Sequence, residues 1–387
     1  MTRKKLAIIT SHPIQYNAPW FKLLAQSKLV QPKIFYTWSQ AGGGAKYDPD
    51  FGKEIEWDIP LLEGYEYIFV KNIAAEPGTH HFKGLVNPTL NKEVEEWQPD
   101  AILVFGWSFD SHLRCLRYFH KKLPVLFRGD STLLDETPGI KRQLRRLFLK
   151  WVYRHVDYAL SVGSHNKDYF RKHGLREEQL IDAPHAIDND RFMEPEEQYR
   201  REALAWRDRL GISGDDLVLL FAGKLESKKN PFFLMELAGR VGSPRLKIII
   251  TGNGILENSL KQAALPDSRI HFIDFQNQLQ MPVVYRLGDV FILPSEGPGE
   301  TWGLAVNEAM ASGCAVMMSQ KAGGSIDLVR DNGLVFGTAE AGKCASFLEE
   351  LAADRGKLAA MKAASRKIIL TFSFEHIVTA IEALLCR

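Results

Sequence analysis

The sequence predicts an α/β protein made of two Rossmann-like domains in tandem, each built on a mostly parallel sheet. Short apolar runs of strand length alternate with longer segments that have apolar residues at helical spacing, a pattern typical of βαβ units. The alternation forms two series, which a charged stretch containing glycines separates near residue 206. The length of 387 residues is sufficient for two domains with separate cores.

The first series contains five apolar runs that we predict to be buried strands. Each run is a few residues long, and several end in glycine or a polar residue. They span residues 5–10, 31–36, 101–106, 124–129 and 158–163. Segments of helical periodicity, such as the one with Trp20, Phe21 and Leu24, lie between them. We assign residues 1–205 to this N-terminal domain.

The second series contains five more predicted strands. They span residues 217–223, 246–252, 270–275, 289–295 and 315–319. We assign residues 206–371 to this C-terminal domain. The segment 367–386 is again helical in its periodicity. We expect it to cross back and complete the first domain, to which we assign residues 372–387.

Composition restricts the function and the compartment. Lys and Arg total 49 against 47 Asp and Glu, a net charge of +2, so no global field would recruit nucleic acid. The four cysteines form no CxxC pair, which favours free thiols in a reducing compartment. The apolar run at 5–10 is too short for a signal peptide or a spanning helix. We expect a cytoplasmic protein, peripheral on the cytoplasmic face of the membrane if it contacts a membrane at all.

Residues that follow the strands of the second series are candidate ligand contacts, because ligands of open α/β sheets bind at the carboxyl ends of the strands. Lys224 and Lys229 follow the first of these strands, and two ammonium groups around one turn suit a diphosphate. Gly252 and Gly254 follow the second strand. We expect these glycines to let backbone N–H groups approach a phosphate or a ribose.

The stretch EGPGETWGLAVNEAM, residues 296–310, places two acids on either side of a predicted helix start. Glu300 ends a loop of glycine and proline, and Glu308 lies about two turns into the helix. The N-terminus of this helix is a predicted anion site, and Gly303 would remove a side chain where the anion approaches. The two carboxylates could then accept hydrogen bonds from sugar and ribose hydroxyls.

These motifs resemble the family-4 retaining glycosyltransferases of the GT-B fold, whose signature is Glu-x7-Glu followed by EAMA-x-G-x-x-V. The matching residues are Glu300, Gly303, Glu308, Ala309, Met310, Ala311, Gly313 and Val316. The resemblance implies two Rossmann-like domains that face each other across a cleft. It also implies transfer of a sugar from a nucleotide diphosphate sugar to an acceptor hydroxyl, with retention at the anomeric carbon. We expect a place in cell-surface polysaccharide or glycolipid assembly.

The resemblance also implies residue roles. Glu300 would contact the donor sugar, Glu308 the ribose, and Lys224 and Lys229 the diphosphate, although the family usually has Arg at the position of Lys224. The other residues that we assign to donor binding are Gly223, Gly252, Gly254, Thr301, Trp302 and Gly303. No cofactor and no metal are expected, because lysines and a helix N-terminus would stabilise the departing diphosphate.

The first domain matches the family pattern less closely. After the first strand it has SHPIQYNAPW where many members have a Gly-Gly loop, and we assign His12, Gln15 and Tyr16 to the acceptor side. Arg128-Gly129-Asp130 stands where many members have His-Gly-x-Asp. We assign Arg128 to the catalytic set and Asp130 to the acceptor side. A structural role stays open for His12, and Arg128 could simply pair with Asp130.

The segment 140–156 predicts a basic amphipathic helix. Its apolar face contains Ile140, Leu144, Leu147, Phe148, Trp151 and Val152, and its basic residues are Lys141, Arg142, Arg145, Arg146, Lys150 and Arg154. Such a helix can lie on an anionic membrane, where the acceptor, a sugar or a lipid-linked molecule, could be met. The apolar face could equally pack against the first sheet, with the charges solvated.

Three other functions fit parts of the sequence. A nucleotide-sugar epimerase of the same fold would need no acceptor, but the Glu-x7-Glu stretch argues against it. A catalytically inactive, membrane-associated scaffold would be favoured if Arg128 blocked the donor-sugar site. An NAD-dependent oxidoreductase is disfavoured because neither domain opens with GxGxxG after its first strand.

Overall fold

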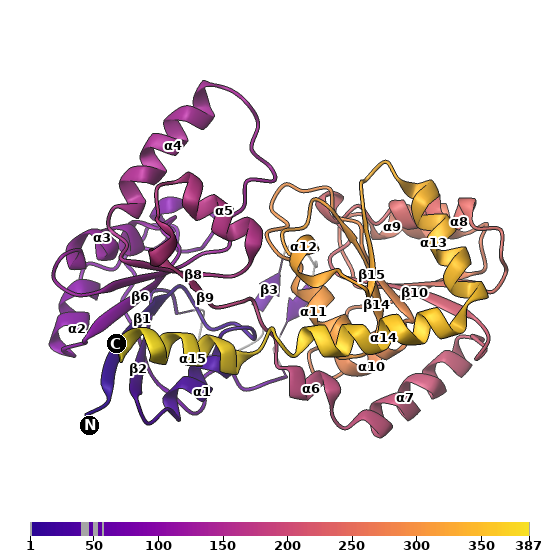
Figure 1. The fold of residues 1–387 in the computed structure, drawn as a ribbon, viewed down its shortest axis with the longest axis horizontal. Helices are drawn as coiled ribbons and strands as arrows, with labels where there is room; N and C mark the ends of the chain where they lie inside the picture. Colours follow the sequence, from indigo (N-terminus) through magenta and orange to yellow (C-terminus); the bar gives the residue numbers. More distant parts are fainter. Residues whose placement is uncertain (1, 40–45, 49–52, 56–57, 387) are drawn as a thin grey trace. The chain divides into compact units, whose positions relative to one another are not determined.

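The computed structural model describes residues 2–39, 46–48, 53–55 and 58–386, and the chain folds into two compact units. The first unit comprises Met1–Gly44, Pro60–His185 and Phe374–Arg387, and the second comprises Ala45–Ile59 and Ala186–Ser373. Each unit is built on a parallel sheet that carries helices, as the alternating sequence pattern predicts (Figure 1).

The sheet of the first unit has seven parallel strands in the order β5-β2-β1-β6-β7-β8-β9. The five strands predicted in this part of the chain are confirmed as β1, β2, β6, β7 and β8. The two edge strands, β5 and β9, have only four and three residues and were not predicted. The strands span Lys4–Thr10 (β1), Val30–Tyr36 (β2), Glu66–Phe69 (β5), Ala101–Phe105 (β6), Val125–Arg128 (β7), Tyr158–Ser161 (β8) and Leu180–Asp182 (β9).

Helices cover both faces of this sheet. On one face, buried side chains of the central strands pack with residues of α2, α3, α4 and α5 in a single core cluster. On the other face, Trp20 of α1 stacks on Phe105 with ring centroids 6.1 Å apart, and α15 packs beside α1. The helices are α1 (Ala18–Ala25), η2 (Phe82–Gly84), α2 (Leu90–Glu96), α3 (Asp110–Phe119), α4 (Ile140–Tyr153), α5 (Ser164–Lys172), η3 (Glu177–Gln179) and α15 (Phe374–Leu385).

The sheet of the second unit has six parallel strands in the order β12-β11-β10-β13-β14-β15. The five predicted strands are confirmed as β10 to β14, and β15 is an unpredicted edge strand. Strand order reverses between β10 and β13, the position where Rossmann folds bind their ligands. The strands span Leu217–Ala222 (β10), Leu246–Thr251 (β11), Ile270–Ile273 (β12), Val290–Leu293 (β13), Ala315–Ser319 (β14) and Gly333–Phe336 (β15).

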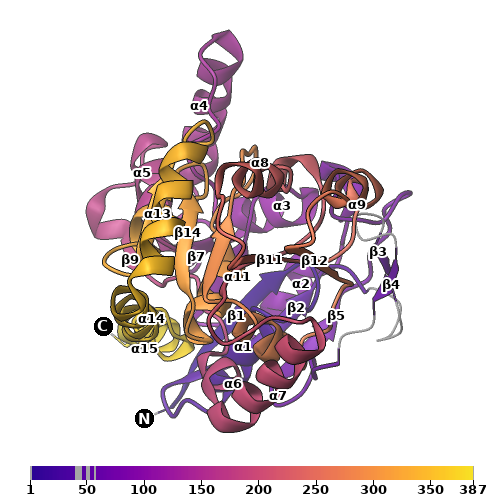
Figure 2. The ribbon, with the colours of Figure 1, turned by 90° about the vertical axis from the view of Figure 1, so that its right-hand side faces the viewer.

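The core of the second unit forms where strands β10, β11, β13 and β14 pack against α8, α9 and α13. Helix α11 packs on β13 and β14 and touches α10. Helices α8 and α9 lie on the side of β11 and β12 opposite to α6 and α7 (Figure 2). The helices are α6 (Asn189–Met193), α7 (Glu196–Arg209), η4 (Ser227–Lys229), α8 (Phe233–Arg240), α9 (Glu257–Ala264), α10 (Met281–Arg286), α11 (Leu304–Ala311), α12 (Ser325–Leu328), α13 (Ala341–Ala353) and α14 (Arg355–Ile369).

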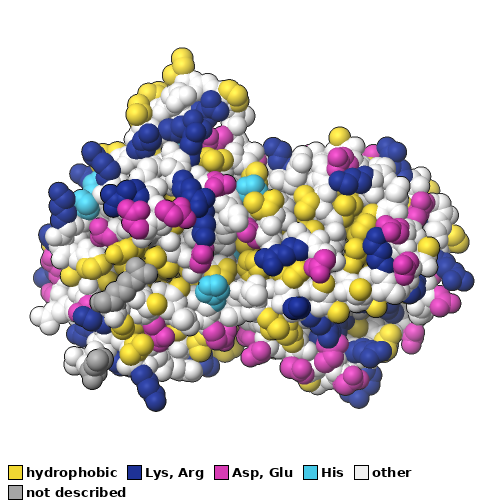
Figure 3. Space-filling view, viewed as in Figure 1, with side chains coloured by type: hydrophobic (Ala, Val, Ile, Leu, Met, Phe, Trp, Pro, Cys, Tyr) yellow, Lys and Arg dark blue, Asp and Glu magenta, His cyan; other side chains and the backbone are white. Residues whose placement is uncertain are grey.

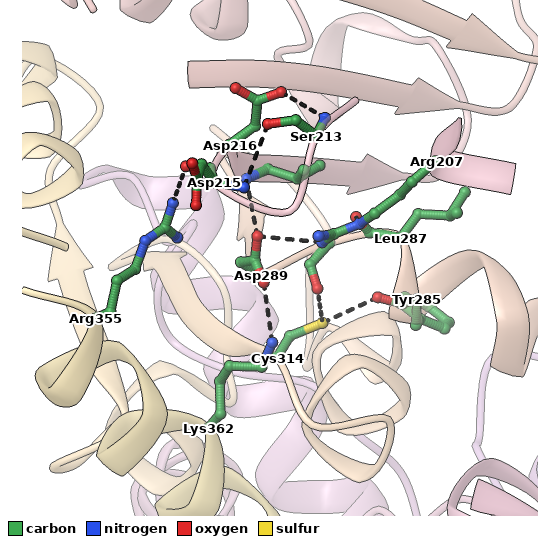
Figure 4. Close-up of polar contacts among 12 residues, drawn as sticks. Arg207, Ser213, Asp215, Asp216, Tyr285, Leu287, Asp289, Cys314, Arg355 and Lys362 are labelled. Carbon is green, nitrogen blue, oxygen red and sulfur yellow. Dashed lines mark hydrogen bonds and ion pairs between the residues drawn. The ribbon is translucent and has the colours of Figure 1, made fainter. Parts of the chain in front are cut away.

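The chain passes from the first unit to the second after His185, whereas the sequence predicts a domain boundary near residue 206. The charged stretch that suggests a linker is the end of α7, which is docked on the second unit. Arg207 donates from Nε to the Leu287 carbonyl at 2.9 Å and from Nη2 to Asp289 at 3.1 Å (Figure 4). Burial would raise the pKa of Asp289, but the charges of Lys362 and Arg207 outweigh it and lower that pKa. The charges of this stretch are therefore used for docking.

A second difference concerns residues 45–59, which group with the second unit although they lie within the predicted first domain. Here β3 (Lys46–Asp48) and β4 (Lys53–Ile55) pair as an antiparallel hairpin. The Asp58 carboxylate that follows accepts the backbone N–H of Leu279 at 3.1 Å. Nothing in the local sequence pattern indicates a partner more than two hundred residues away.

The C-terminal helix belongs to the first unit, as predicted. The predicted helical segment is divided into two helices: α14 ends at Ile369, and α15 begins at Phe374. Glu382 of α15 accepts a hydrogen bond from Ser27, which follows α1. The span Arg355–Leu385 is long and apolar enough to cross a membrane by length and composition alone. However, the span is divided between α14 and α15, and apolar residues of α15 are buried. Both features are typical of helices that pack in a protein core.

Candidate functional site

The candidate site of the second unit lies where the turn after β10, residues 223–230, meets the loop after β13, residues 294–303. We call these two segments the switch-point loops, because β10 and β13 are neighbours at the point where strand order reverses. The Glu296 N–H donates to the Lys228 carbonyl at 3.0 Å, and the Asn230 amide donates to the Glu296 carboxylate at 2.9 Å. The two loops are thus bonded to each other.

The Glu300 carboxylate lies at the centre of this junction. Its side chain is 9% exposed. Its Oε2 atom accepts from Lys229 Nζ and from Ser295 Oγ, the latter at 2.9 Å. Within the described part of the chain no hydrogen bond to its Oε1 atom is present. One oxygen is therefore held by the protein while the other can accept from a ligand hydroxyl.

Glu308 is the second acid of the predicted pair. It lies in α11 and is only 3% exposed. The Tyr285 hydroxyl donates to Glu308 Oε2 at 2.7 Å from the neighbouring helix α10. Both acids of the predicted pair thus bond to a hydroxyl group. Sequence reasoning identified neither Ser295 nor Tyr285, since their partners become evident only when the loops and helices are assembled.

The basic groups lie in the first switch-point loop. Lys224 and Lys229 are both half-buried, at the start and near the end of the turn after β10. Lys229 reaches Glu300 across the junction. Thr301 follows Glu300, and α11 begins three residues later at Leu304, so the positive end of its dipole faces the second loop. The structure thus gathers the predicted lysines, Glu300 and Thr301 on two adjoining loops.

Gly252 and Gly254 have a packing role that differs from the predicted one. The Gly252 N–H donates to the Ile273 carbonyl at 2.9 Å, so it is already bonded within the sheet. A β-carbon on Gly252 would collide with the Gly223 carbonyl oxygen, and one on Gly254 would lie 2.6 Å from the Leu225 carbonyl oxygen. The two glycines therefore allow the loop after β11 to lie against the turn after β10.

Gly303 and Trp302 are also explained by packing. Gly303 has a φ of +100°, and a β-carbon there would lie 2.6 Å from the Leu293 side chain, on the core side. The reason for glycine is therefore the core contact and the left-handed backbone, in place of the predicted space for an anion. Trp302 is buried, and its Nε1 donates to Asn307 at 2.9 Å. The helix starts at Leu304, directly after Gly303.

In the first unit, Arg128 is committed to backbone groups. It is the last residue of β7 and is buried. Its Nη1 donates to the Ala183 carbonyl at 2.7 Å and its Nη2 to the Pro184 carbonyl at 3.2 Å. Burial lowers the pKa of Arg128 to about 10, although the nearby Asp130 carboxylate opposes the shift. Arg128 therefore fixes the loop after β9.

The other first-unit candidates lie after β1 and β7. His12, Gln15 and Tyr16 lie in the segment between β1 and α1, and His12 contacts Trp38 edge-on with ring centroids 5.4 Å apart. The Asp130 side chain is half-exposed, and its Oδ2 lies 3.9 Å from Nε2 of His185. These residues are placed at the carboxyl edge of the first sheet, where ligand contacts are expected.

Sequence reasoning missed the buried His112. Its Nε2 lies 3.0 Å from Thr37 Oγ1 and its Nδ1 lies 2.8 Å from the Phe105 carbonyl. Thr37 Oγ1 also donates to the Thr10 carbonyl at 3.2 Å, so the group joins the ends of β1, β2 and β6. Burial lowers the pKa of His112 to about 4, which keeps the ring neutral. A histidine in an ordinary amphipathic helix gives no sequence signal for this role.

The sequence left open whether the apolar face of helix α4 packs against the first sheet or stays exposed, and the structure shows both. Leu149, Val152 and Tyr153 in its C-terminal half are buried in the core. In its N-terminal half Ile140 is 80% exposed and Leu144 is 62% exposed. The helix projects from the first unit (Figure 1), and apolar and basic side chains lie together at its free end (Figure 3). One half packs against the sheet while the other presents apolar groups to solvent.

Known proteins resemble the chain in sequence and in fold. Residues 203–368 match the glycosyl transferases group 1 family. Over 201 residues the chain is 28% identical to the D-inositol 3-phosphate glycosyltransferase of Stackebrandtia nassauensis, a match that covers 48% of this chain. The match covers only 44% of that protein, so the chain spans less than half the length of this relative.

Two solved structures are similar over the whole chain. Anabaena HepE in complex with UDP and glucose has a TM-score of 0.72 and 16% identity, covering 99% of this chain and 100% of that one. Sucrose-phosphate synthase from Thermosynechococcus elongatus has a TM-score of 0.74 and 16% identity, with 99% and 98% covered. The chain has the GT-B fold. Within this GT-B protein, the group 1 match includes both switch-point loops and α11 and leaves out every first-unit candidate.

Proposed function

We propose that the protein is a retaining glycosyltransferase that uses a nucleoside diphosphate sugar as donor. The observation that carries the proposal is the Glu300 carboxylate at the switch point, held by Lys229 and Ser295 on one oxygen. A buried carboxylate with an oxygen left to accept suits the hydroxyls of a sugar. The match of residues 203–368 to the glycosyl transferases group 1 family supports the same class of reaction.

The donor would lie along the switch-point loops. Its diphosphate would take the charges of Lys224, Lys229 and the N-terminus of α11, its sugar would bond to Glu300, and its ribose to Glu308. Lys229 is paired with Glu300 in the structure and so stands where it can contact both the diphosphate and the acid. Because HepE is similar in fold and binds UDP and glucose, a UDP-sugar is the first donor to test.

The reaction would form a bond between the acceptor oxygen and the anomeric carbon while the bond from that carbon to the phosphate oxygen breaks. The acceptor proton would pass to the departing phosphate. The negative charge that develops on the diphosphate would be stabilised by the two lysines and the helix dipole, without a metal or another cofactor. Preorganised positive groups of this kind lower the barrier because they need no rearrangement during the reaction.

The acceptor is proposed to be a sugar or a lipid-linked molecule of cell-surface polysaccharide or glycolipid assembly, met on the cytoplasmic face of the membrane. Support comes from the exposed apolar residues of α4, which lie among basic side chains. Apolar groups can enter the headgroup region while the basic groups attract anionic lipids. Arg146 is bonded to Glu136 at 2.7 Å and is less available for lipid than Lys141 and Arg145.

The membrane part is tested with vesicles of anionic phospholipid. The double variant Lys141→Glu and Arg145→Glu should weaken vesicle binding about tenfold or more, since each charge contributes about 1 kcal/mol at such a surface. The matched control reverses two exposed lysines of the same unit, Lys83→Glu and Lys92→Glu, and should bind nearly as the wild type does. Equal binding by all three proteins contradicts the proposal.

The donor part is tested by thermal unfolding in the presence of UDP, GDP and ADP and their sugars. A ligand at 100 times its dissociation constant should stabilise the protein by about 2.7 kcal/mol. The nucleotide that stabilises is then used in transfer assays, with the product's anomeric configuration read by NMR. Release of an isomerised nucleotide sugar without an acceptor would favour an epimerase instead. No stabilisation by any nucleotide would contradict the proposal.

A further inference from the structure

Tyr285 makes a buried contact with the proposed ribose-binding acid. Its side chain is fully buried, and its hydroxyl lies 2.7 Å from Glu308 Oε2. The two residues lie on different helices, α10 and α11, and both belong to the second unit. A buried carboxylate is stable only when donors compensate for its lost hydration, and this hydroxyl is such a donor.

The tyrosine ring is itself held on several sides. It contacts Phe291 of β13 and Phe192 of α6 edge-on, with ring centroids 5.6 and 5.9 Å apart. Its backbone carbonyl accepts from the Cys314 thiol at 3.1 Å (Figure 4). The hydroxyl therefore approaches Glu308 from a fixed direction. The ring packing alone would be equally well served by phenylalanine, so the hydroxyl is what the contact with Glu308 requires.

We propose that Tyr285 is a positioning residue that orients Glu308 for the ribose of the donor. With Oε2 bonded to the tyrosine, the carboxylate cannot rotate freely about its last bond, so it would present a fixed orientation to a ribose hydroxyl. Orientation of this kind increases affinity because it removes rotational freedom before the ligand binds. The proposal rests on the proposed function, since it assigns a partner to the acid that would bind the donor nucleotide.

The test compares two ligands that differ in the ribose. Calorimetric titration measures the dissociation constants of UDP and of inorganic pyrophosphate for the wild type and for Tyr285→Phe. Because the substitution removes only the orientation of Glu308 and leaves the acid itself in place, it should raise the dissociation constant of UDP roughly fivefold to tenfold, less than loss of the acid would. The constant for pyrophosphate, which has no ribose, should stay unchanged. Tyr199→Phe, at a tyrosine of α7 in the same unit, is the matched control and should leave both constants unchanged.

A double-mutant cycle with Glu308→Gln locates the effect. If Tyr285 acts through Glu308, the substitution Tyr285→Phe should change UDP affinity much less in the Glu308→Gln background than in the wild type. The melting temperature of each variant shows that the fold is kept.

Three results would overturn the assignment of Tyr285: wild-type UDP affinity in Tyr285→Phe, equal weakening of UDP and pyrophosphate, or the same loss in both backgrounds. Equal weakening would identify a purely structural role for the hydroxyl. Failure of the wild type to bind UDP, GDP or ADP at all would instead overturn the proposed function, and the inference with it. The two failures are thus distinguished by the wild-type titration alone.

Discussion

The sheets of the two units have the same strand order around their first strands. The side chains at the carboxyl ends of those strands differ in chemistry. In both units strand order reverses beside the first strand, between β1 and β6 and between β10 and β13. At the second of these points Lys229, Ser295 and Glu300 form a charged group on two loops. At the first, the neutral His112 ring bonds to Thr37 and to the Phe105 carbonyl.

The difference shows that topology selects the place of a site and side chains select its ligand. At the first edge the Thr37 hydroxyl and the His112 ring bond to each other and to backbone carbonyls, and burial keeps His112 uncharged. The second edge keeps lysines and a carboxylate on loops, where an ionic ligand can reach them. This contrast supports the second edge as the place of the proposed phosphate-containing donor.

The largest expected effect is on turnover in Glu300→Gln. If the acid contacts the transferred sugar, its loss should lower the transfer rate about 100-fold or more, because the contact strengthens as charge develops in the transition state. UDP affinity should change little, since UDP has no sugar beyond its ribose. Glu349→Gln, at an exposed glutamate of α13 in the same unit, is the control. A large loss of UDP affinity in Glu300→Gln would break the assignment of this edge.

The second effect is on nucleotide affinity in Glu308→Gln. Loss of a charged hydrogen bond to the ribose should weaken both the donor and free UDP by about 1.5–3 kcal/mol. Titration of UDP beside initial rates at saturating donor separates this effect from a loss of turnover. Equal losses of UDP affinity in Glu300→Gln and Glu308→Gln would show that the two acids do not divide the sugar and the ribose between them.

A smaller effect concerns the stability of the first edge. The pKa of His112 is about 4 in the folded protein and the ordinary value is 6.5, so below pH 6.5 the unfolded chain takes up a proton that the folded one does not. The free energy of unfolding should therefore fall by about 1.4 kcal/mol per pH unit between those two values. At higher pH the contribution is complete.

The measurement is urea unfolding of the wild type and of His112→Gln across that pH range. The variant should lose this part of the slope, while His80→Gln, an exposed histidine of the same unit, should keep it. Identical slopes in the wild type and His112→Gln would mean that the ring is accessible to protons, which would weaken the contrast between the two edges.

The smallest expected effect is that of a chelator. Transfer activity should persist in excess EDTA, because lysines and a helix N-terminus stand where a divalent ion would otherwise stabilise the diphosphate. Initial rates with and without EDTA, after dialysis, measure this. Loss of activity that magnesium or manganese restores would show that the charges of the second edge are insufficient by themselves.

The sequence by itself was sufficient for the fold class and for most strands. Apolar runs of strand length are visible locally, because each buried parallel strand must be apolar on both faces. The edge strands β5 and β9 were missed, because segments of three or four residues are too short to give a clear strand pattern. The spacing of Glu300 and Glu308 across a helix start was equally visible, because loop, glycine and helix follow one another in the chain.

Only the tertiary structure decided which groups hold these acids and what the glycines are for. Tyr285 and Glu308 are 23 residues apart, and their contact exists only when α10 packs on α11. Gly303 looked like space for a ligand, yet its missing side chain would meet Leu293 in the core. Apolar periodicity is a property of neighbouring residues and can be read along the chain. Hydrogen-bond partners and close contacts depend on which distant segments pack together, and no local pattern contains that information.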